Sequence, residues 1–375
     1  MKSSLDPTPG PARFLPLLAA LWLGACATPP APQAPPAPAE AVPPEETAAV
    51  PLRLAAVGDI MLGGSAAPEM VRHGYDYPFE ATRHLLQQAD IVFGNLEGPL
   101  TDGGVPVADK TYVFRSPPAK VAPALAAAGF RVLSLANNHA LDYGPEGLFH
   151  TIAALERAGI APVGAGADLE QSRRAVILQT GQGRLAFLAY SLTFPKAFWA
   201  GPARPGTAFG HETHVRQDVA RAKREADMVV VSFHWGREAT TELRDYQVAL
   251  GRAAIEAGAG VVLGHHPHVL QAVERYRDGV ILYSLGNFAF GSYSRRATRS
   301  VIAQLEFRQA RLRRLTLVPL DVNNVEVVFQ PRPLEGEAAR EVIAHLDRLS
   351  RARGTPIAYE NGTGVLLFGE EQNGN

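Results

Sequence analysis

The chain has 375 residues, 46% of them hydrophobic, and 36 Lys and Arg nearly balance 37 Asp and Glu, giving a net charge of −1. This balance argues against a nucleic-acid partner, because such proteins normally present a basic surface. Cys26 is the only cysteine, which excludes an intrachain disulfide and a Cys-rich metal site.

The first 25 residues have the order of a bacterial lipoprotein signal peptide. A basic start is followed by an apolar run at 14–23, too short to span a bilayer, and small residues stand just before Cys26. We predict that residues 1–25 are removed and that Cys26 becomes a lipidated N-terminus. An ordinary signal peptide with an incidental cysteine is the alternative. Ala27 rather than aspartate follows Cys26, which favours the outer membrane if the cell is Gram-negative.

Residues 26–51 comprise Cys26 and a predicted linker. Nine of the 23 residues from 29 to 51 are proline, and no apolar periodicity is present. Such a sequence stays extended and solvated, so we expect a disordered tether between the lipid and the folded domain. We therefore expect an exported protein of the cell envelope that contacts the membrane through its lipid.

From residue 52 onward, short apolar or β-branched runs alternate with segments of helical spacing. The runs predict strands at 52–57, 89–93, 131–135, 184–190, 228–233, 260–263 and 279–285, and the spacing predicts helices at 79–88, 119–128, 147–158, 215–226 and 246–257. This alternation is typical of βαβ units, in which ligands collect beyond the carboxyl ends of the strands.

After residue 290 the pattern changes. Runs at 301–307, 312–320 and 325–329 predict antiparallel strands, and 335–351 predicts a helix. We assign residues 52–332 to one α/β domain and residues 333–375 to a C-terminal helix and tail.

Five of the predicted strands end in polar motifs that place ligand-type side chains at one edge of the sheet. The motifs contain Asp59; Asn95 and Glu97; Asn137, Asn138 and His139 with Asp142; His234 with Glu238; and His265, His266 and His268. Carboxylate, amide and imidazole groups together suit Zn²⁺, Mn²⁺ or Fe better than Ca²⁺, which takes oxygen alone.

Each motif taken alone has an ordinary structural explanation. Asp59 could cap a helix, Asn137 and Asn138 could make a turn, and a single strand-end histidine is usually structural. Three imidazoles in the four residues 265–268 are hard to explain as the end of a buried strand. They favour metal or anion binding.

In order and wording, these motifs resemble the CapA family of capsule and poly-γ-glutamate biosynthesis proteins, over about residues 52–322. The resemblance is carried by Gly58-Asp59-Ile60-Met61, Asn95-Leu96-Glu97-Gly98, Tyr112-Val113-Phe114-Arg115-Ser116-Pro117, Asn137-Asn138-His139 with Asp142, His234-Trp235-Gly236, Gly264-His265-His266-Pro267-His268 and Tyr283-Ser284-Leu285-Gly286-Asn287-Phe288. It implies a calcineurin-like metallophosphoesterase fold, a β-sandwich flanked by helices (α/β/β/α).

The resemblance also implies a metal site of one or two divalent ions. Its ligands would be Asp59, Glu97, Asn138, His234, His266 and His268, with His139 contacting the leaving group. The sequence departs from that pattern where Met61 replaces a histidine, and where Asn95 and Glu97 replace two aspartates. His265 could also take the place of His266.

Other residues near these motifs are candidates for catalysis or substrate binding. Asp142 and Glu238 join His139 as candidate catalytic residues, and Lys110, Arg115, Arg237 and Asn287 are candidate substrate-binding residues for an anionic substrate. Charged residues are often simply solvated, and Asn287 could instead orient a metal ligand.

Together these features predict an envelope protein that acts in synthesis, anchoring or processing of a capsule polymer such as poly-γ-glutamate. The expected activity is metal-dependent hydrolysis of a phosphoester or amide bond. The expected partners are the anionic polymer and subunits of its synthase. Two alternatives stay open: a non-catalytic polymer-assembly factor on the same fold, and a generic periplasmic metallophosphoesterase.

Overall fold

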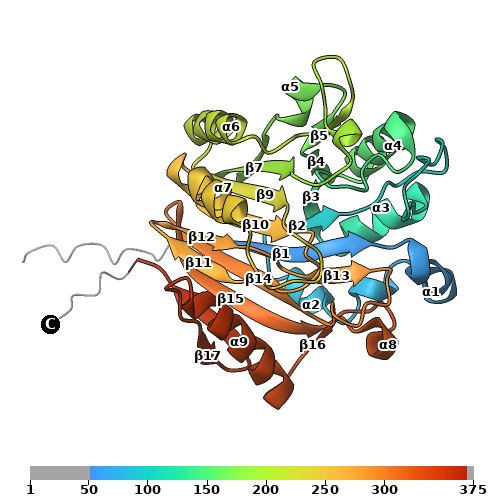
Figure 1. Cartoon of the computed structure of the whole chain (residues 1–375). Helices are drawn as coiled ribbons and strands as arrows, with labels where there is room; N and C mark the ends of the chain where they lie inside the picture. The colour runs from blue at the N-terminus through green and yellow to red at the C-terminus, as the bar shows by residue number, and fades with distance from the viewer. Residues whose placement is uncertain (1–50, 370–375) are drawn as a thin grey trace, which may run out of the picture. The chain divides into compact units, whose positions relative to one another are not determined.

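The computed structural model describes residues 51–369 (Figure 1). The predicted signal peptide, the lipidation of Cys26 and nearly all of the predicted linker lie outside these residues. Within the described range, none of the helices combines the length and the apolar character that a membrane span requires.

Two large sheets form the centre of the domain. In the ten-stranded sheet eight strands follow the order β17-β18-β15-β14-β1-β2-β3-β4, while β13 pairs with β1 and β16 with β15. The six-stranded sheet follows the order β11-β12-β10-β9-β7-β6. The larger sheet contains β1 (Leu52–Met61), β2 (Ile91–Leu96), β3 (Phe130–Ser134), β4 (Ala161–Val163), β13 (Asn287–Phe290), β14 (Arg299–Arg308), β15 (Arg311–Asp321), β16 (Arg332–Pro333), β17 (Ala358–Glu360) and β18 (Thr363–Leu367). The smaller contains β6 (Val176–Thr180), β7 (Gly183–Ser191), β9 (Met228–His234), β10 (Val261–His265), β11 (Val273–Tyr276) and β12 (Gly279–Leu282).

Helices and short elements complete the domain. The helices are α1 (Ala67–His73), α2 (Arg83–Leu86), α3 (Pro118–Ala127), α4 (Gly144–Arg157), α5 (Leu169–Ser172), α6 (Glu212–Glu225), α7 (Asp245–Glu256), α8 (Asn324–Val327) and α9 (Gly336–Arg351), with 3-10 turns at Gly64–Ala66, Tyr77–Phe79 and Lys196–Phe198. β5 (Ala165–Gly166) and β8 (Gly206–Thr207) pair in a separate small sheet.

Three hydrophobic clusters define the layers. One lies between the two sheets, one between the larger sheet and helices that include α3 and α4, and one between the smaller sheet and helices α6 and α7. Strand β1 contributes side chains to two of these clusters, because successive side chains of a strand point to opposite faces of the sheet. Leu54 and Ala56 pack in the central cluster, whereas Ala55 and Val57 pack beneath the helices. The predicted α/β/β/α sandwich is confirmed.

The parallel strands bring the predicted motifs together. Strands β1 to β4 run parallel in one sheet, and β7, β9, β10 and β12 run parallel in the other. In the larger sheet Asp59 stands opposite Asn95, and in the smaller sheet His234 stands opposite His265. The carboxyl ends of both sheets therefore present their polar residues at the same end of the sandwich.

The structure corrects two predicted elements. The predicted helix at 79–88 is a 3-10 turn followed by the four-residue α2. The predicted strand at 325–329 is instead helix α8, because the side chain of Asn323 accepts a hydrogen bond from Val325 N and caps it. Residues 328 and 329 then take left-handed backbone angles, which a strand does not allow.

The C-terminal segment also contains more structure than predicted. The helix at 335–351 is confirmed as α9, and its Val342, Ile343 and Leu346 pack in the cluster between the sheets. The predicted tail includes the hairpin β17–β18, which pairs with β15 and extends the larger sheet.

Candidate metal centre

Glu97, just after β2, is the central residue of the site. It is fully buried, yet neither carboxylate oxygen has a hydrogen-bond partner among residues 51–369. Three imidazole nitrogens face its Oε1 atom: Nε2 of His234 at 3.5 Å, of His268 at 3.9 Å and of His139 at 4.0 Å. Burial, together with the nearby charge of Asp59, raises the pKa of Glu97 to about 8.

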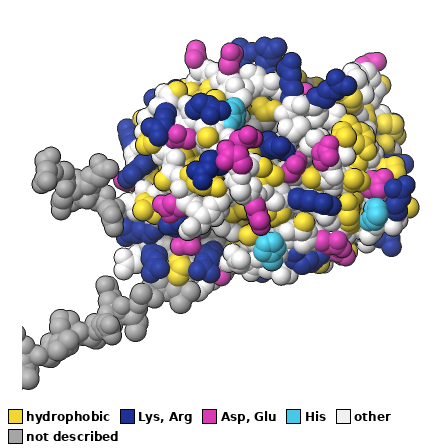
Figure 2. Space-filling model, turned by 90° about the horizontal axis from the view of Figure 1, so that it is seen from below, with side chains coloured by type: hydrophobic (Ala, Val, Ile, Leu, Met, Phe, Trp, Pro, Cys, Tyr) yellow, Lys and Arg dark blue, Asp and Glu magenta, His cyan; other side chains and the backbone are white. Residues whose placement is uncertain are grey.

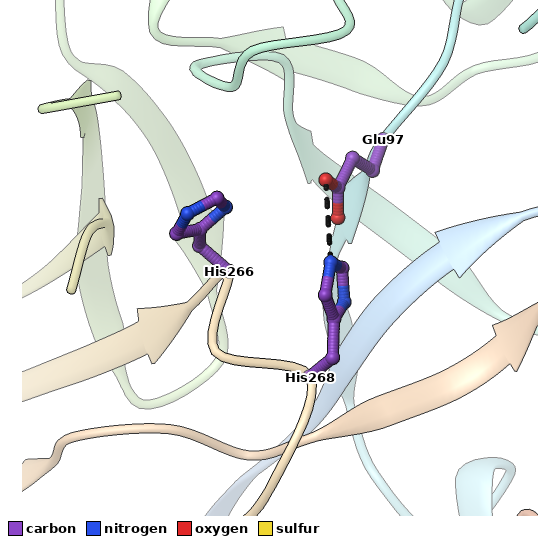
Figure 3. A group of neighbouring side chains, drawn as sticks. All are labelled: Glu97, His266 and His268. Atoms are coloured by element: carbon purple, nitrogen blue, oxygen red, sulfur yellow. Dashed lines mark ion pairs between the residues drawn. The ribbon is translucent and has the colours of Figure 1, made fainter. Parts of the chain in front are cut away.

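A buried carboxylate without hydrogen bonds is costly unless it is protonated or holds a cation. Two groups of potential metal ligands share Glu97, and within each the donor atoms lie within 4.8 Å of one another. One group is Asp59, Glu97 and His234, and the other is Glu97, His266 and His268. Figure 3 shows the second group, with Glu97 above His268 and with His266 beside them on the loop that follows β10.

Asp59 is held in place by neighbours on two segments, strand β2 and the loop after β10. Its Oδ1 accepts a hydrogen bond from Asn95 Nδ2 at 2.8 Å, and its Oδ2 accepts one from His266 N at 3.1 Å. Burial alone would raise the pKa of Asp59, but the hydrogen bond and charge of His268 outweigh it and hold the pKa well below its usual range. Asp59 is therefore an anionic oxygen donor at the centre of the site.

Glycine is required next to Asp59. Backbone N of Asp59 donates to Gly286 O at 3.0 Å, which draws β1 against the segment before β13. A Cβ at Gly58 would lie 1.9 Å from that same oxygen, so no other residue permits the approach.

The structure separates His265 from His266. His265 ends β10 with its Nδ1 3.2 Å from Ser232 Oγ and its Nε2 3.3 Å from Val57 O, and it belongs to neither ligand group. The chain then turns sharply, with φ of 93° at His266 and 59° at His268. Such left-handed angles are strained for non-glycine residues and are frequent at functional sites. The turn directs His266 and His268 toward Glu97.

His234 and Asn138 meet from opposite sheets. His234 Nε2 lies 2.7 Å from Asn138 Oδ1, and the same nitrogen lies 3.5 Å from Glu97 Oε1. Burial lowers the pKa of His234 to about 3, and the ring is therefore neutral, as a metal ligand must be. Asn137 supports this corner, because its Nδ2 donates to Leu96 O at 2.8 Å and its Oδ1 accepts from His139 N at 3.0 Å.

The pKa of His268 is shifted in the opposite direction from that of His234. Burial would lower its pKa, but the carboxylates of Glu97 and Asp59 outweigh that effect and raise it to about 10. Its Nδ1 lies 2.8 Å from Asn287 Oδ1 and 3.2 Å from Asp59 Oδ2. Asn287, predicted to bind substrate, is buried and orients His268 in this structure.

His139, Asp142 and Lys110 form a compact group beside Glu97. Asp142 is fully buried; its Oδ2 lies 2.7 Å from His139 Nδ1 and accepts a hydrogen bond from Phe114 N at 2.8 Å. Lys110 pairs with the other oxygen of Asp142 and donates to Asn138 O at 2.7 Å. Burial lowers the pKa of Lys110, although Asp142 acts against that shift. Lys110, predicted to bind substrate, is thus engaged with the protein itself.

The remaining predicted residues lie further out. Arg115 stacks its guanidinium over the ring of Tyr143 at 4.9 Å. Arg237 and Glu238 are exposed on the loop after β9, and the charge of Glu238 is near enough to contribute to the raised pKa of His268. The sequence interpretation gave no role to Asn95 and Asn137, although both occur in its motifs. Their bonds to Asp59 and Leu96 depend on the register between strands.

The donor set fits a divalent transition ion. It offers carboxylate, amide and imidazole atoms and no thiolate, which suits Zn²⁺, Mn²⁺ or Fe. The unpartnered oxygens of Glu97 and the unpartnered Nδ1 of His266 are the positions that such an ion would satisfy within residues 51–369. Met61, where the resemblance places a histidine, is buried at the end of β1 and supplies no ligand of that kind.

Residues 53–292 match the family model described as bacterial capsule synthesis protein PGA_cap. The chain belongs to this family. It is 35% identical over 278 residues to the capsule biosynthesis protein CapA of Bacillus anthracis, a match that covers 72% of this chain and 67% of that protein. It is 32% identical over 316 residues to the PGA biosynthesis protein CapA of Bacillus subtilis (strain 168), covering 83% of this chain and 80% of that one.

A solved structure also resembles this PGA_cap protein. The 5'-nucleotidase precursor of Thermus thermophilus is 14% identical, with a TM-score of 0.43, and the match covers 83% of this chain and 61% of that one. The family assignment rests on the family model and on the CapA relatives.

Proposed function

We propose that this PGA_cap protein is a metal-dependent hydrolase that processes a capsule polymer of the poly-γ-glutamate type. The observation that carries the proposal is the buried carboxylate of Glu97, whose oxygens have no hydrogen-bond partner among residues 51–369 and which faces three imidazoles. The printed names of the CapA relatives, which refer to capsule and PGA biosynthesis, support the polymer as the biological context.

The residues that would hold one or two ions surround Glu97. Asp59 and His234 form one candidate ligand group with it, His266 and His268 form the other, and Asn138 adjoins His234. A bound Zn²⁺, Mn²⁺ or Fe ion supplies Lewis acidity toward a phosphoryl or carbonyl oxygen. Asn287 and Asn95 fix the orientation of His268 and Asp59, as outer-sphere partners of ligands do.

His139 is placed to move a proton. Asp142 Oδ2 accepts a hydrogen bond from His139 Nδ1–H, which leaves Nε2 facing the Glu97 side of the site to exchange a proton with a leaving group. Lys110 forms an ion pair with Asp142 and fixes its position. Glu238, which is exposed on the loop after β9, is a second candidate for proton transfer.

The anionic substrate would be drawn by basic side chains. Arg237 is exposed near the same edge and is free to contact a carboxylate or phosphate group, whereas Lys110 is engaged within the protein. The partners in this proposal are the polymer and subunits of its synthase. Lipidation at Cys26 would hold the domain at the cell envelope, on the periplasmic side of the outer membrane in a Gram-negative cell.

Hydrolysis assays test this proposal. Purified protein is incubated with γ-glutamyl oligomers and with phosphoesters, with Zn²⁺, Mn²⁺ or Fe²⁺ or with a chelator. We expect turnover of at least one class with metal and none with chelator. His139→Ala should remove activity while leaving the metal content intact, and His73→Ala, an exposed residue on α1, should retain both. Absence of turnover with every ion and with both classes of substrate would falsify the hydrolase proposal.

A specific observation favours a second function, a non-catalytic polymer-assembly factor. Met61 stands where a two-metal phosphoesterase pattern places a histidine. The ligand group of Asp59, Glu97 and His234 therefore lacks the histidine that this pattern would add. Complementation of a polymer-deficient strain separates the two functions. If His139→Ala and His268→Ala both restore full polymer production, the assembly function replaces the hydrolase. A generic phosphoesterase predicts phosphoester turnover with no effect of either variant on polymer.

A further inference from the structure

A second cavity lies at the end of the sandwich opposite the metal centre. Its volume is about 560 Å³, and its walls include Met228, Gly260 and Gly279, at the amino ends of the parallel strands β9, β10 and β12. The metal centre lies at the carboxyl ends of the same sheets. In Figure 1 the amino ends of these strands lie on the left, where β11 and β12 are labelled.

The charged side chains of this cavity are mainly basic. Five basic residues and two acidic residues line it: Lys223, Arg275, Arg277, Arg311 and Arg313, with Asp227 and Asp278. One of the acids is already engaged, because Asp227 Oδ2 accepts a hydrogen bond from Arg184 N at 2.7 Å. The cavity thus has an excess of positive charge although the whole chain carries −1.

The fold holds two of the arginines toward the cavity for identifiable reasons. Arg313 lies at a β-bulge: Arg314 pairs with Glu306 and Leu312 with Phe307, so Arg313 has no partner on β14. A bulge re-aims the side chain of its extra residue. Arg275 rests over the Phe368 ring at 5.2 Å and donates to Leu367 O at 3.4 Å.

Arg311 and Arg313 are the most available cations of the cavity. Neither side chain has an ion-pair partner among residues 51–369, whereas Arg277 lies 3.6 Å from Glu256. Arg311 is exposed and Arg313 is half-buried. Unpaired guanidinium groups in a concave site bind carboxylates well, because their planar donors match the two carboxylate oxygens.

The walls of the cavity are apolar between these cations. Phe307, Leu312 and Phe368 contribute to the lining and are each less than about a tenth exposed. A ligand that suits both features carries carboxylates on aliphatic stems, since its methylene groups contact the apolar wall while its carboxylates reach the arginines. The concave shape favours a flexible chain over the flat surface of a membrane.

We propose that this basic cavity binds a carboxylate-rich polymer chain of the polyglutamate class, as a holding site remote from the metal centre. The inference rests on the proposed function for the identity of the polymer. It adds a second contact on the same molecule, so that a long chain is held at one end of the sandwich while another part reaches the metal centre at the other.

Fluorescence anisotropy with labelled poly-γ-glutamate tests the site on the purified full-length protein. Arg311→Glu with Arg313→Glu should weaken binding about tenfold or more and reduce its salt dependence. The control is Arg340→Glu with Arg348→Glu on α9, which should change binding less than about twofold. On the face of the molecule shown in Figure 2, basic and acidic side chains are mixed, and neither sign of charge dominates. Circular dichroism and melting curves verify folding, and Arg311→Gln with Arg313→Gln replaces the pair if it fails to fold.

Two further measurements distinguish failure of this inference from failure of the proposed hydrolase function. Glu97→Gln should lose metal but keep polymer binding, and the Arg311/Arg313 pair should keep its metal. If Glu97→Gln abolishes polymer binding, or if the Arg311/Arg313 pair binds like the parent, the cavity is not a polymer site. Binding to anionic phosphatidylglycerol vesicles, with none to poly-γ-glutamate, would also overturn it in favour of a membrane contact.

Discussion

The Nε2 atom of His234 lies 3.5 Å from Oε1 of Glu97, although the two residues come from different sheets of the sandwich. His234 ends β9, and Glu97 follows β2. The contact exists because the carboxyl ends of parallel strands in both sheets meet at one end of the domain. Neutral imidazole and unpartnered carboxylate then face one another in a position where a cation satisfies both.

The first prediction concerns the stability of the metal-free protein. Since the folded state raises the pKa of Glu97 from its ordinary 4.5 to about 8, the folded protein binds this proton more tightly than the unfolded chain. The contribution of this proton to the free energy of unfolding is therefore fully present below about pH 4.5 and is lost as pH rises through 8. Glu97→Gln lacks this loss, so with chelator at pH 8 it should exceed the parent by about 1–3 kcal/mol.

Urea unfolding with chelator, at pH 5 and pH 8, measures this difference. Glu341→Gln, an exposed residue on α9, is the matched control and should follow the parent at both pH values. Equal stability of Glu97→Gln and parent at pH 8 would contradict the buried, unpartnered carboxylate.

The second prediction separates the two adjacent histidines. His266→Ala should weaken metal binding by more than the roughly 10- to 100-fold that loss of an outer-sphere partner produces, because it removes a ligand. His265→Ala should lower the melting temperature, since Ser232 and Val57 lose a buried partner, while the folded variant keeps near-parent metal affinity. Titration calorimetry with Zn²⁺ or Mn²⁺ decides; the opposite ranking would assign the ligand to His265.

The third prediction is a pH dependence of metal binding. In the metal-free site burial and the charge of Asp59 raise the pKa of Glu97, and the hydrogen bond and charge of Asp59 raise the pKa of His268, so both groups favour the protonated form. Both protons must leave on binding, whereas His234 is already neutral. Affinity should therefore rise from pH 6 to pH 8, by about tenfold per pH unit for each proton released.

Calorimetry in buffers of different ionisation enthalpy counts those protons directly. An affinity that is constant over this range, with no buffer-dependent heat, would exclude Glu97 and His268 as ligands.

Much of the architecture could be predicted from sequence because buried parallel strands read as apolar runs that end at polar motifs. The strand before Asp59 and the one before His234 were located within a few residues for this reason. The meeting of these motifs also followed, since parallel strands have their carboxyl ends on one side.

What could not be predicted depends on a local helix cap, on the packing of a loop and on backbone angles. Residues 325–329 are apolar enough for a strand, but the cap from Asn323 makes them begin as helix α8. Lys110 has the sequence signature of a solvated charge, and only the packing of its loop against Asp142 makes it part of the site. The distinction between His265 and His266 depended on backbone angles that composition does not encode.

The fourth prediction addresses the membrane anchor. Cys26→Ser should abolish fatty-acid labelling and stable membrane attachment, while the folded domain, which the structure describes over residues 51–369, still forms. Fractionation and metabolic labelling measure both. Labelling equal to that of the parent would show that Cys26 is not the lipidation site.

The central claim is that Glu97 organises a metal centre, and elemental analysis of purified protein tests it most directly. Parent and Glu341→Gln should each carry one or two equivalents of Zn, Mn or Fe after loading and desalting. Glu97→Gln, which keeps the shape of the side chain but removes its charge, should retain about a tenth of that amount or less. A parent that retains no transition metal, or a Glu97→Gln variant that retains as much as the parent, would contradict the account.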